Sequence, residues 1–456
     1  MSIRDLVLSI VMTVLLPWCF KDVRVGLLTW LWFGLMNPHR YTWGFARTFP
    51  FGQFIALITL AGVLFNKGVK RLPLQREVVL ILVCWAFWTM TTFGALEPEE
   101  AWHKWGEVTK ILFMVLLSTC VEWDRMWIRY MTAVIAFSIG FVGVKGALFG
   151  FRTGGDFMVL GPPGSFLEAN TAVAVALDMV LPLLLILARD EQSTHRFKMV
   201  CLGAFALSAL SALLTYSRGG LLGLLVVGGM VLIKSKYKVL AAPLALIGFC
   251  FAYWFLPDEW FGKMETIEDY EEDMSAMSRI VTWKVLWLFA LDHPLTGGGF
   301  RLYSGWIFDR YLFQALPADE AAKWVGHWWD AHSIWFAMLA EHGFIGLFLY
   351  VILIVSTFMT LLWIKRVARY YPQLAWMESY GSLLFVSFCA FVITGTFLDF
   401  AYFDLFFQLI GLTVILKTLA IKELAAIPVP EPAPNMPYGM LRPADAAFQT
   451  QPRPAP

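Results

Sequence analysis

The sequence predicts an all-α membrane protein that crosses the bilayer many times. Hydrophobic residues fill 59% of its 456 positions and charged residues only 15%, against about 25% in ordinary soluble domains. Many apolar runs reach or approach 18 residues, which is long enough for a transmembrane helix. The six cysteines lie in or beside these runs and indicate no disulfide framework. The net charge of +1 provides no global basic field, so we expect no nucleic acid partner.

We expect about 12–13 transmembrane helices. Two short N-terminal segments, 4–20 and 24–36, either span separately or form one re-entrant or interfacial unit, so the count is 13 or 12. The first of them lacks a small-residue cleavage site, and we expect it to remain in the mature protein. The other predicted spans lie near residues 51–66, 78–94, 107–121, 128–150, 170–188, 198–215, 219–233, 238–256, 344–364, 380–396 and 402–420.

Lysine and arginine in the short connections predict the orientation. Four connections are basic, and the number of spans between them puts all four on one side, which we predict to be cytoplasmic. These connections are 67–77, 189–198, 234–238 and 365–369. The segments predicted on the opposite, outer side are the acidic segment 95–106, 151–169, the turn at Arg218, 257–343 and 397–401.

Two regions differ from this pattern of spans and turns. Residues 257–343 are too many for a loop without structure of its own. Within them, RIVTWKVLWLFALDHPLTGGG predicts a short amphipathic helix at the membrane interface, ended by Pro294 and the glycines 297–299. After the membrane domain, 1–420, the tail 421–456 contains nine of the 22 prolines, and we expect it to be disordered and cytoplasmic.

Two arginines stand out on the predicted outer face. Arg218, in TYSRGG, lies in a turn of a few residues between two spans, and Arg279 opens the amphipathic helix. An arginine in such a turn can be an anchor that extends to the interface. The flanking Gly219 and Gly220 favour a second interpretation, because glycine lets the backbone and a ligand approach closely.

The stretch WWDAHSIWFAMLAEHGFIG contains His332, which either faces solvent at a helix start or acts as a general base. If Asp330 caps this helix, His332 lies in the first turn, where the helix dipole disfavours imidazolium and keeps the base neutral. Its helical face would then carry the apolar side chains Trp335, Phe336 and Leu339.

Glu341 and His342 follow in the same stretch. Glu341 lies about half a turn round a continuous helix from His332, so it cannot orient that imidazole. We predict that Glu341 is a local structural partner near a helix break at Gly343, and that His342 is scaffolding.

Other polar and aromatic residues leave alternatives open. His327, Asp330, His332 and His342 offer metal-ligand chemistry, yet their spacing matches no established motif. The tryptophans at 324, 328, 329 and 335 fit an interface belt, or a surface that stacks on a sugar or packs on a lipid. Asp178 and Lys145 lie within predicted spans, where they either pair across helices or belong to a proton path.

Several blocks of the sequence resemble a known family. TYSRGG, SRIVTW followed by HPLTGGGF, and AHSIWFAMLAEHGFIGL resemble, in that order, the signature blocks of the O-antigen ligase (WaaL/Wzy-like) membrane family. More narrowly, NPHRYTWGFA, VKGALFGFRTGG and GPPGSFLEANTAVAVALDMVLPL are similar to the O-glycosylation ligases associated with exosortase A systems. The resemblance runs from about residue 5 to residue 420. One departure is His332-Ser333, where the family block often reads HN.

This resemblance implies a GT-C-like, metal-independent and inverting glycosyltransferase of the bacterial inner membrane that works on the periplasmic face. The implied donor is a glycan on undecaprenyl diphosphate, and the implied acceptor is lipid A-core, a protein or another glycan, with no cofactor. The family's two essential arginines correspond to Arg218 and Arg279, and its essential histidine corresponds to His332.

The chemistry of these residues agrees with that implication. Arginines form bidentate hydrogen bonds to phosphate oxygens without a metal. Each hydrogen bond to an atom on which charge develops stabilises the transition state by ~3 kcal/mol. His332 would take the proton of the acceptor hydroxyl. Further candidates for phosphate, sugar or other substrate contact are Lys145, Arg152, Arg301 and Trp328.

Three functions remain open at this point: a ligase, a Wzy-type polymerase that extends a lipid-linked polysaccharide, and a transporter of lipid-linked glycans that uses Asp178 and Lys145. A transporter is expected to have internal repeats and interrupted helices near mid-membrane. The sequence has no evident repeat, and its polar residues gather on one predicted face, which favours the two enzymes.

Overall fold

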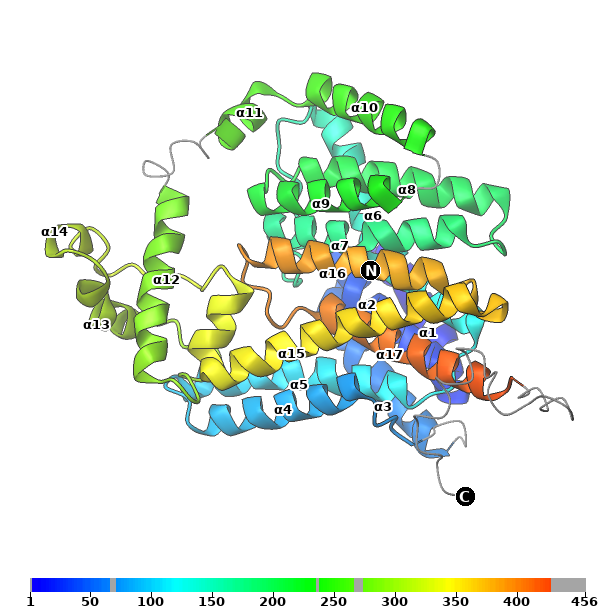
Figure 1. The fold of residues 1–456 in the computed structure, drawn as a ribbon, viewed down its shortest axis with the longest axis horizontal. Coiled ribbons are helices and arrows are strands. Elements are labelled where there is room, and N and C mark those ends of the chain that lie inside the picture. Colours follow the sequence, from blue (N-terminus) through cyan, green and yellow to red (C-terminus); the bar gives the residue numbers. More distant parts are fainter. Residues whose placement is uncertain (1, 66–70, 235–237, 266–273, 428–456) are drawn as a thin grey trace, which may run out of the picture. The chain divides into compact units, whose positions relative to one another are not determined.

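A computed structural model describes residues 2–65, 71–234, 238–265 and 274–427. These residues contain no β-strand, which confirms the predicted all-α class. Three short 3-10 helices accompany the α-helices: η1 (Pro38–Tyr41), η2 (Phe45–Arg47) and η3 (Pro372–Leu374). The α-helices are α1 (Ile3–Lys21), α2 (Val23–Met36), α3 (Phe51–Phe65), α4 (Arg76–Phe93), α5 (Pro98–Thr119), α6 (Arg125–Thr153), α7 (Asn170–Arg189), α8 (His195–Leu213), α9 (Arg218–Lys234), α10 (Lys238–Phe255), α11 (Asp258–Glu265), α12 (Met274–Asp292), α13 (Gly305–Ala315), α14 (Ala318–Ala321), α15 (Ile334–Tyr370), α16 (Met377–Gly395) and α17 (Asp404–Ala425) (Figure 1).

Every predicted span overlaps one of these helices, and eight helices in the described residues are long and apolar enough to cross a membrane: α1, α4, α6, α7, α8, α15, α16 and α17. The predicted 12–13 also counts helices such as α2 and α3. These have 14 and 15 residues, so at 1.5 Å per residue they are shorter than a hydrocarbon core of about 30 Å. Helix α5 is long enough, but it begins with the charged sequence PEEAWHKWGE.

The centre of the fold is α7, which is apolar on all sides and almost completely buried. It packs against α6, α8, α9 and α16. Glycines bring α6 and α8 together, because a side chain at Gly143, Gly146 or Gly150 would collide with Ser208, Ser211 or Leu214. This arrangement is the small-residue packing typical of membrane helices.

The chain divides into two units, residues 1–419 and 420–456. The second unit begins with the last residues of α17, which ends at Ala425. The predicted disorder of the tail concerns residues that, from 428 onward, lie outside the described part of the chain.

The predicted amphipathic helix is present as α12, beside α13 and α15 (Figure 1). It ends at Asp292, before Pro294, as the sequence predicts. The following glycines allow a sharp turn, since Gly297 and Gly299 have positive φ angles of 61° and 82°.

Helix α15 is broken at Gly343, where φ is 67° and ψ is −171°, and the loop after α12 fits this break. The Phe344 N–H donates to the Pro294 carbonyl at 2.8 Å, and the Gly298 N–H donates to the Ala340 carbonyl at 2.9 Å. The Gly299 N–H donates to the carbonyl of Glu341 at 2.8 Å. The break predicted at Gly343 is therefore confirmed, and the loop supplies hydrogen-bond partners to the interrupted helix.

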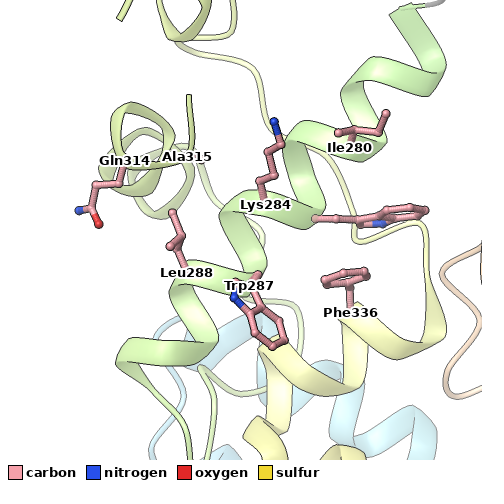
Figure 2. A pocket seen from close by; sticks show the side chains of 8 residues that line it. Ile280, Lys284, Trp287, Leu288, Gln314, Ala315 and Phe336 are labelled. Atoms are coloured by element: carbon pink, nitrogen blue, oxygen red, sulfur yellow. The ribbon is translucent and has the colours of Figure 1, made fainter. Parts of the chain in front are cut away.

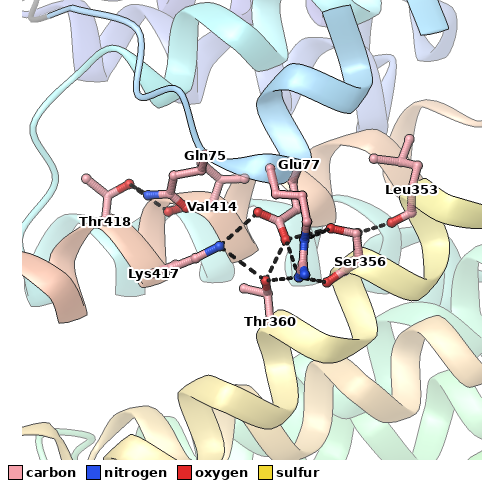
Figure 3. Close-up of polar contacts among 10 residues, drawn as sticks. Gln75, Glu77, Leu353, Ser356, Thr360, Val414, Lys417 and Thr418 are labelled. Carbon is pink, nitrogen blue, oxygen red and sulfur yellow. Dashed lines mark hydrogen bonds and ion pairs between the residues drawn. The ribbon is translucent and has the colours of Figure 1, made fainter. Parts of the chain in front are cut away.

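Far along α15 from this break, one buried carboxylate joins α4, α15 and α17 (Figure 3). Glu77 is fully buried, and its Oε1 accepts hydrogen bonds from Ser356 at 2.8 Å and Thr360 at 2.5 Å. The ammonium of Lys417 lies 3.1 Å from Oε2, and the Arg76 guanidinium lies 3.2 Å from Oε1. Hydroxyl donors and two cations thus compensate the buried charge, as a stable buried ion pair requires.

We predict that Glu77→Ala destabilises the protein by about 3–5 kcal/mol, because it leaves Lys417 without its carboxylate and four groups without a common acceptor. The measurement is the thermal or denaturant midpoint of the purified protein. The control is Glu378→Ala, which removes a half-exposed ion pair with Arg369 and should cost less than about 1 kcal/mol. Equal losses in the two variants would contradict this role of Glu77.

We also predict that Gly343→Ala lowers stability by about 1–3 kcal/mol, since it strains the left-handed backbone. A methyl group there would lie 2.6 Å from the Pro294 carbonyl oxygen. The matched control is Gly228→Ala in α9, where the added methyl group meets no atom within 4 Å and a helical alanine is favoured. An unfolding midpoint for Gly343→Ala at or above that of Gly228→Ala would contradict the close packing of the loop after α12 at the Gly343 break.

Candidate active site

His332 and Arg279 lie close together at the start of α15. His332 is half-buried between two buried residues, Ala331 and Ser333. The Trp283 indole of α12 donates to the carbonyl of Ala331 at 2.7 Å, which joins the helix of Arg279 to the segment of His332. Fifty-three positions separate the two candidates in the sequence, and α12 packs on α15 to bring them together.

The predicted cap by Asp330 is wrong. Helix α15 begins at Ile334 with Ser333 as its N-cap, and Asp330 lies exposed before it. His332 therefore precedes the helix and has a positive φ of 45°, which is rare for a residue other than glycine. Since His332 is outside the helix, it shares no helical face with Phe336, which instead stacks on Trp283 at 5.3 Å.

The surroundings of His332 favour the neutral imidazole. Burial lowers the pKa of His332 below its ordinary value of 6.5, and the Arg279 guanidinium lowers it further. The Asp330 carboxylate acts in the opposite direction and raises this pKa. The expected neutral histidine thus has a different cause from the helix dipole, namely burial and a neighbouring cation.

Arg218 begins α9, immediately after a turn held in place by distant parts of the chain. The Tyr216 hydroxyl donates to the Gly155 carbonyl at 2.8 Å, and the Asn170 amide donates to the Thr215 carbonyl at 2.8 Å. Nε of Arg218 donates to the carbonyl of Lys263 in α11 at 3.1 Å. These contacts fix the position of the arginine at the helix start.

Gly219 and Gly220 differ in their surroundings. Both are buried, and an added side chain at Gly220 would collide with Ala174 of α7. A side chain at Gly219 would meet Phe397 and Thr394 at 3.8 Å, which is an ordinary contact distance. Gly220 therefore lets α9 pack closely against α7 next to Arg218, and the approach of a ligand to these glycines stays a prediction.

Phe397 connects this turn with the His332 segment. It adjoins Gly219 on one side, and on the other its ring lies 6.3 Å from the Trp283 ring. Trp283 in turn bonds to Ala331. The segments that carry Arg218, Arg279 and His332 are thus joined by one continuous set of contacts.

A groove of 420 Å³ contains three aromatic side chains, Trp283, Trp287 and Phe336 (Figure 2), and Trp283 also donates to the carbonyl of Ala331, the residue before His332. Lys284 of α12 and Gln314 of α13 add polar groups to its rim. Aromatic faces with a few polar groups suit a sugar ring as well as an acyl or prenyl chain. The aromatic content of this region is visible in the sequence, but the groove forms only because α12, α13 and α15 meet.

Glu341 and His342 are structural, as predicted. Glu341 accepts a hydrogen bond from the Tyr402 hydroxyl at 2.5 Å and one from the Arg301 N–H at 2.9 Å. Nε2 of His342 lies 2.7 Å from the same Tyr402 hydroxyl, and Nδ1 lies 2.7 Å from the Thr91 hydroxyl. These bonds join α4, α15 and the segment before α17 around the helix break.

Arg301 is held by Glu341 in a strained conformation, with φ at 53° and its side chain exposed. Its guanidinium charge acts on Asp399, which lies between α16 and α17. Burial, followed by the neighbouring carboxylates Glu341 and Asp330, raises the pKa of Asp399 well above its ordinary value. Sequence reasoning did not single out Asp399, although it is the one charged residue of the predicted outer turn 397–401.

The other candidates lie on different elements. Arg152 is exposed in the last turn of α6, and Trp328 is half-exposed, with its ring against Gly305 at the start of α13. Lys145 lies over the Tyr41 ring at 4.6 Å.

The expected pair of Lys145 with Asp178 is wrong, because the buried Asp178 carboxylate faces Gly223 and Thr394 and has no hydrogen-bond partner in the described chain.

Within the described ranges, no three His, Cys, Asp or Glu side chains form a group suited to a metal ion. The absence of a metal requirement stays a prediction.

Comparison with known families gives matches in two parts of the chain, one of which supports the resemblance. Residues 203–351 match the family described as O-Antigen ligase, and this range contains Arg218, Arg279 and His332. Residues 3–192 match a family of unknown function (DUF5935). No curated protein matches the chain. The narrower link with exosortase A systems stays a prediction. Residues 203–351 are thus similar to an O-Antigen ligase domain, and they belong to a multi-pass membrane protein whose described residues include eight helices long and apolar enough to span a membrane.

Proposed function

We propose that this protein transfers a glycan from undecaprenyl diphosphate to an acceptor hydroxyl on the periplasmic face of the bacterial inner membrane. The observation that carries the proposal is the half-buried His332 beside Arg279, both within the O-antigen ligase match. The acceptor is lipid A-core, a protein or another glycan. The C-terminal tail is cytoplasmic in this topology.

His332 acts as the general base. A base must be neutral before it takes a proton, and burial and Arg279 favour the neutral form. The imidazole takes the proton of the acceptor hydroxyl while that oxygen attacks the anomeric carbon. The bond between this carbon and the diphosphate oxygen breaks on the opposite face, so the anomeric configuration inverts. Undecaprenyl diphosphate leaves with the bonding electron pair, and His332 returns its proton to water.

Arg279 and Arg218 stabilise the diphosphate as negative charge builds on its leaving oxygen. The guanidinium group is permanently charged and forms two parallel hydrogen bonds to phosphate, so it performs this task without a metal. The site is partly shielded from water, which strengthens each contact. Arg218 is held by a rigid turn, and such preorganisation reduces the motion needed in the transition state.

Sugar binding involves the groove beside Ala331. Trp283, Trp287 and Phe336 present apolar rings, and Lys284 and Gln314 offer hydrogen-bond donors to hydroxyl groups. Trp328 and Arg301 contact the glycan or acceptor from the loops on either side of α13. Arg152 serves as a more distant phosphate contact.

The test is transfer by purified full-length protein from undecaprenyl diphosphate glycan to candidate acceptors, in the presence of a chelator. We expect activity with the chelator, and a loss of about 100-fold or more in His332→Ala and Arg218→Ala, as is typical when a base or an oxyanion donor is removed. Arg310→Ala, an exposed arginine on α13, is the control and should retain activity. Normal transfer in both site variants would refute the site, and loss of activity with chelator would refute metal-free transfer. A glycan that grows on undecaprenyl diphosphate, in place of one moved to an acceptor, would identify a polymerase.

The pH dependence gives a second prediction. Transfer should fall as pH decreases through the pKa of His332, and this acid limb should lie below pH 6.5 because that pKa is lowered. Arg279→Gln removes a neighbouring cation and should move the limb to higher pH, whereas Asp330→Asn should move it to lower pH. The limb is measured relative to each variant's own plateau rate. A limb that stays in place in both variants would show that another group controls it.

A further inference from the structure

A second group of basic side chains lies in the first half of the chain, around Tyr41. The Arg4 guanidinium donates to the Tyr41 carbonyl at 3.1 Å, and its centre lies 4.8 Å from the Trp43 ring. The Lys145 ammonium lies 4.6 Å from the Tyr41 ring. Arg40 precedes Tyr41 in η1. Arg4, Arg40 and Lys145, which we call the Tyr41 cluster, thus come from α1, η1 and α6.

The fold holds this cluster in a fixed position. The buried Asp5 carboxylate accepts the Gly44 N–H at 3.2 Å, which ties the segment of Tyr41 to α1. His39 stacks on the buried Phe33 at 5.3 Å with nearly parallel rings. The segment is therefore anchored from two sides by α1 and α2, and the cations do not depend on a free loop.

Arg40 lies against the loop before α7. A side chain at Gly164 would lie 2.9 Å from the Arg40 Nη1 atom, so the guanidinium lies directly against this glycine. The φ of Gly164 is 72°, which also favours glycine. Nε of Arg40 is buried and has no hydrogen-bond partner in the described chain. A buried N–H group without an acceptor is costly, so Arg40 still needs a partner that the described residues do not supply.

The cluster has an excess of positive charge that its own carboxylates do not neutralise. Asp5 and Glu168 accept the Gly44 and Gly164 N–H groups, at 3.2 Å and 2.8 Å. Within the described residues, none of the three cations forms an ion pair within 4 Å. Arg4 and Lys145 both contact Tyr41, so their like charges repel each other, and an anion placed between them would remove that repulsion.

The surroundings indicate that this anion is part of a lipid. Both α1 and α6 are long and apolar enough to span a membrane, and Arg4 lies in the first turn of α1. Large apolar side chains beside the cluster are exposed, with Ile3 at 81% and Trp43 at 75%. Basic and tryptophan side chains at the end of apolar helices are typical of the headgroup level of a bilayer.

We propose that the Tyr41 cluster binds the phosphate headgroup of an anionic membrane phospholipid. Arg40 and Arg4 donate N–H groups to phosphate oxygens, and Lys145 contributes a point charge on its flexible chain. The acyl chains lie along the exposed apolar faces of α1 and α6. This site belongs to the half of the chain that matches the family of unknown function, and it is independent of the proposed transfer reaction.

The experiment measures lipid binding to the full-length protein. Protein in phosphatidylcholine nanodiscs is titrated with phosphatidylglycerol, and bound lipid is counted by native mass spectrometry. We expect the wild type to retain phosphatidylglycerol in preference to phosphatidylcholine, and the double variant Arg40→Gln/Lys145→Gln to bind it at least tenfold more weakly. Arg47→Gln changes an exposed cation of the same segment and should bind like the wild type.

Melting midpoints show whether the variants are folded. If the double variant is not folded, the single variant Lys145→Gln is measured in its place, because the Lys145 side chain is exposed. Unchanged phosphatidylglycerol binding in the folded variant would overturn the proposal, as would equal binding of the two lipids by the wild type. Displacement of the lipid by millimolar inorganic phosphate would show a site for free phosphate and would also overturn the lipid assignment. Transfer activity is not the readout, so failure here leaves the proposed reaction intact.

Discussion

The structure around His332 depends on backbone hydrogen bonds between the loop after α12 and the broken helix α15. A helix interrupted in apolar surroundings leaves carbonyl and N–H groups without partners, and each such group is costly to bury. The glycine loop supplies these partners from its own backbone. These bonds hold the end of α12 against the break in α15, and the bond from Trp283 to the Ala331 carbonyl holds α12 against the segment before α15. The arginine of α12 and the histidine preceding α15 are therefore held together.

The sequence predicted the helices well, because apolar runs of bilayer length have few alternatives to a helix. It also predicted the end of α12 and the break at Gly343, where proline and glycine act through local backbone geometry. The number of full spans was less accessible. Segments such as 24–36 are apolar but short, and composition alone does not say whether they cross a bilayer.

The candidate site was less predictable from local patterns. The expected cap at Asp330 failed because a contact from Trp283, 48 positions away, fixes the Ala331 carbonyl and delays the helix to Ile334. The expected pair of Lys145 with Asp178 failed because neighbouring helices cannot be deduced from one sequence. The closeness of Arg279 and His332 agrees with the family resemblance, which carried information that spacing did not. Asp399 was missed because nothing local distinguishes it from an ordinary turn residue.

The left-handed backbone of His332 has an evolutionary consequence. A residue other than glycine costs roughly 1 kcal/mol or more in this conformation, although asparagine, aspartate and histidine adopt it more often than others. Stability alone would therefore favour glycine or asparagine over this histidine. A chain that keeps it accepts a less stable start to α15, which is the trade between stability and activity expected at a working site. Stabilising variants of this protein selected without regard to transfer should accumulate asparagine or glycine at this position.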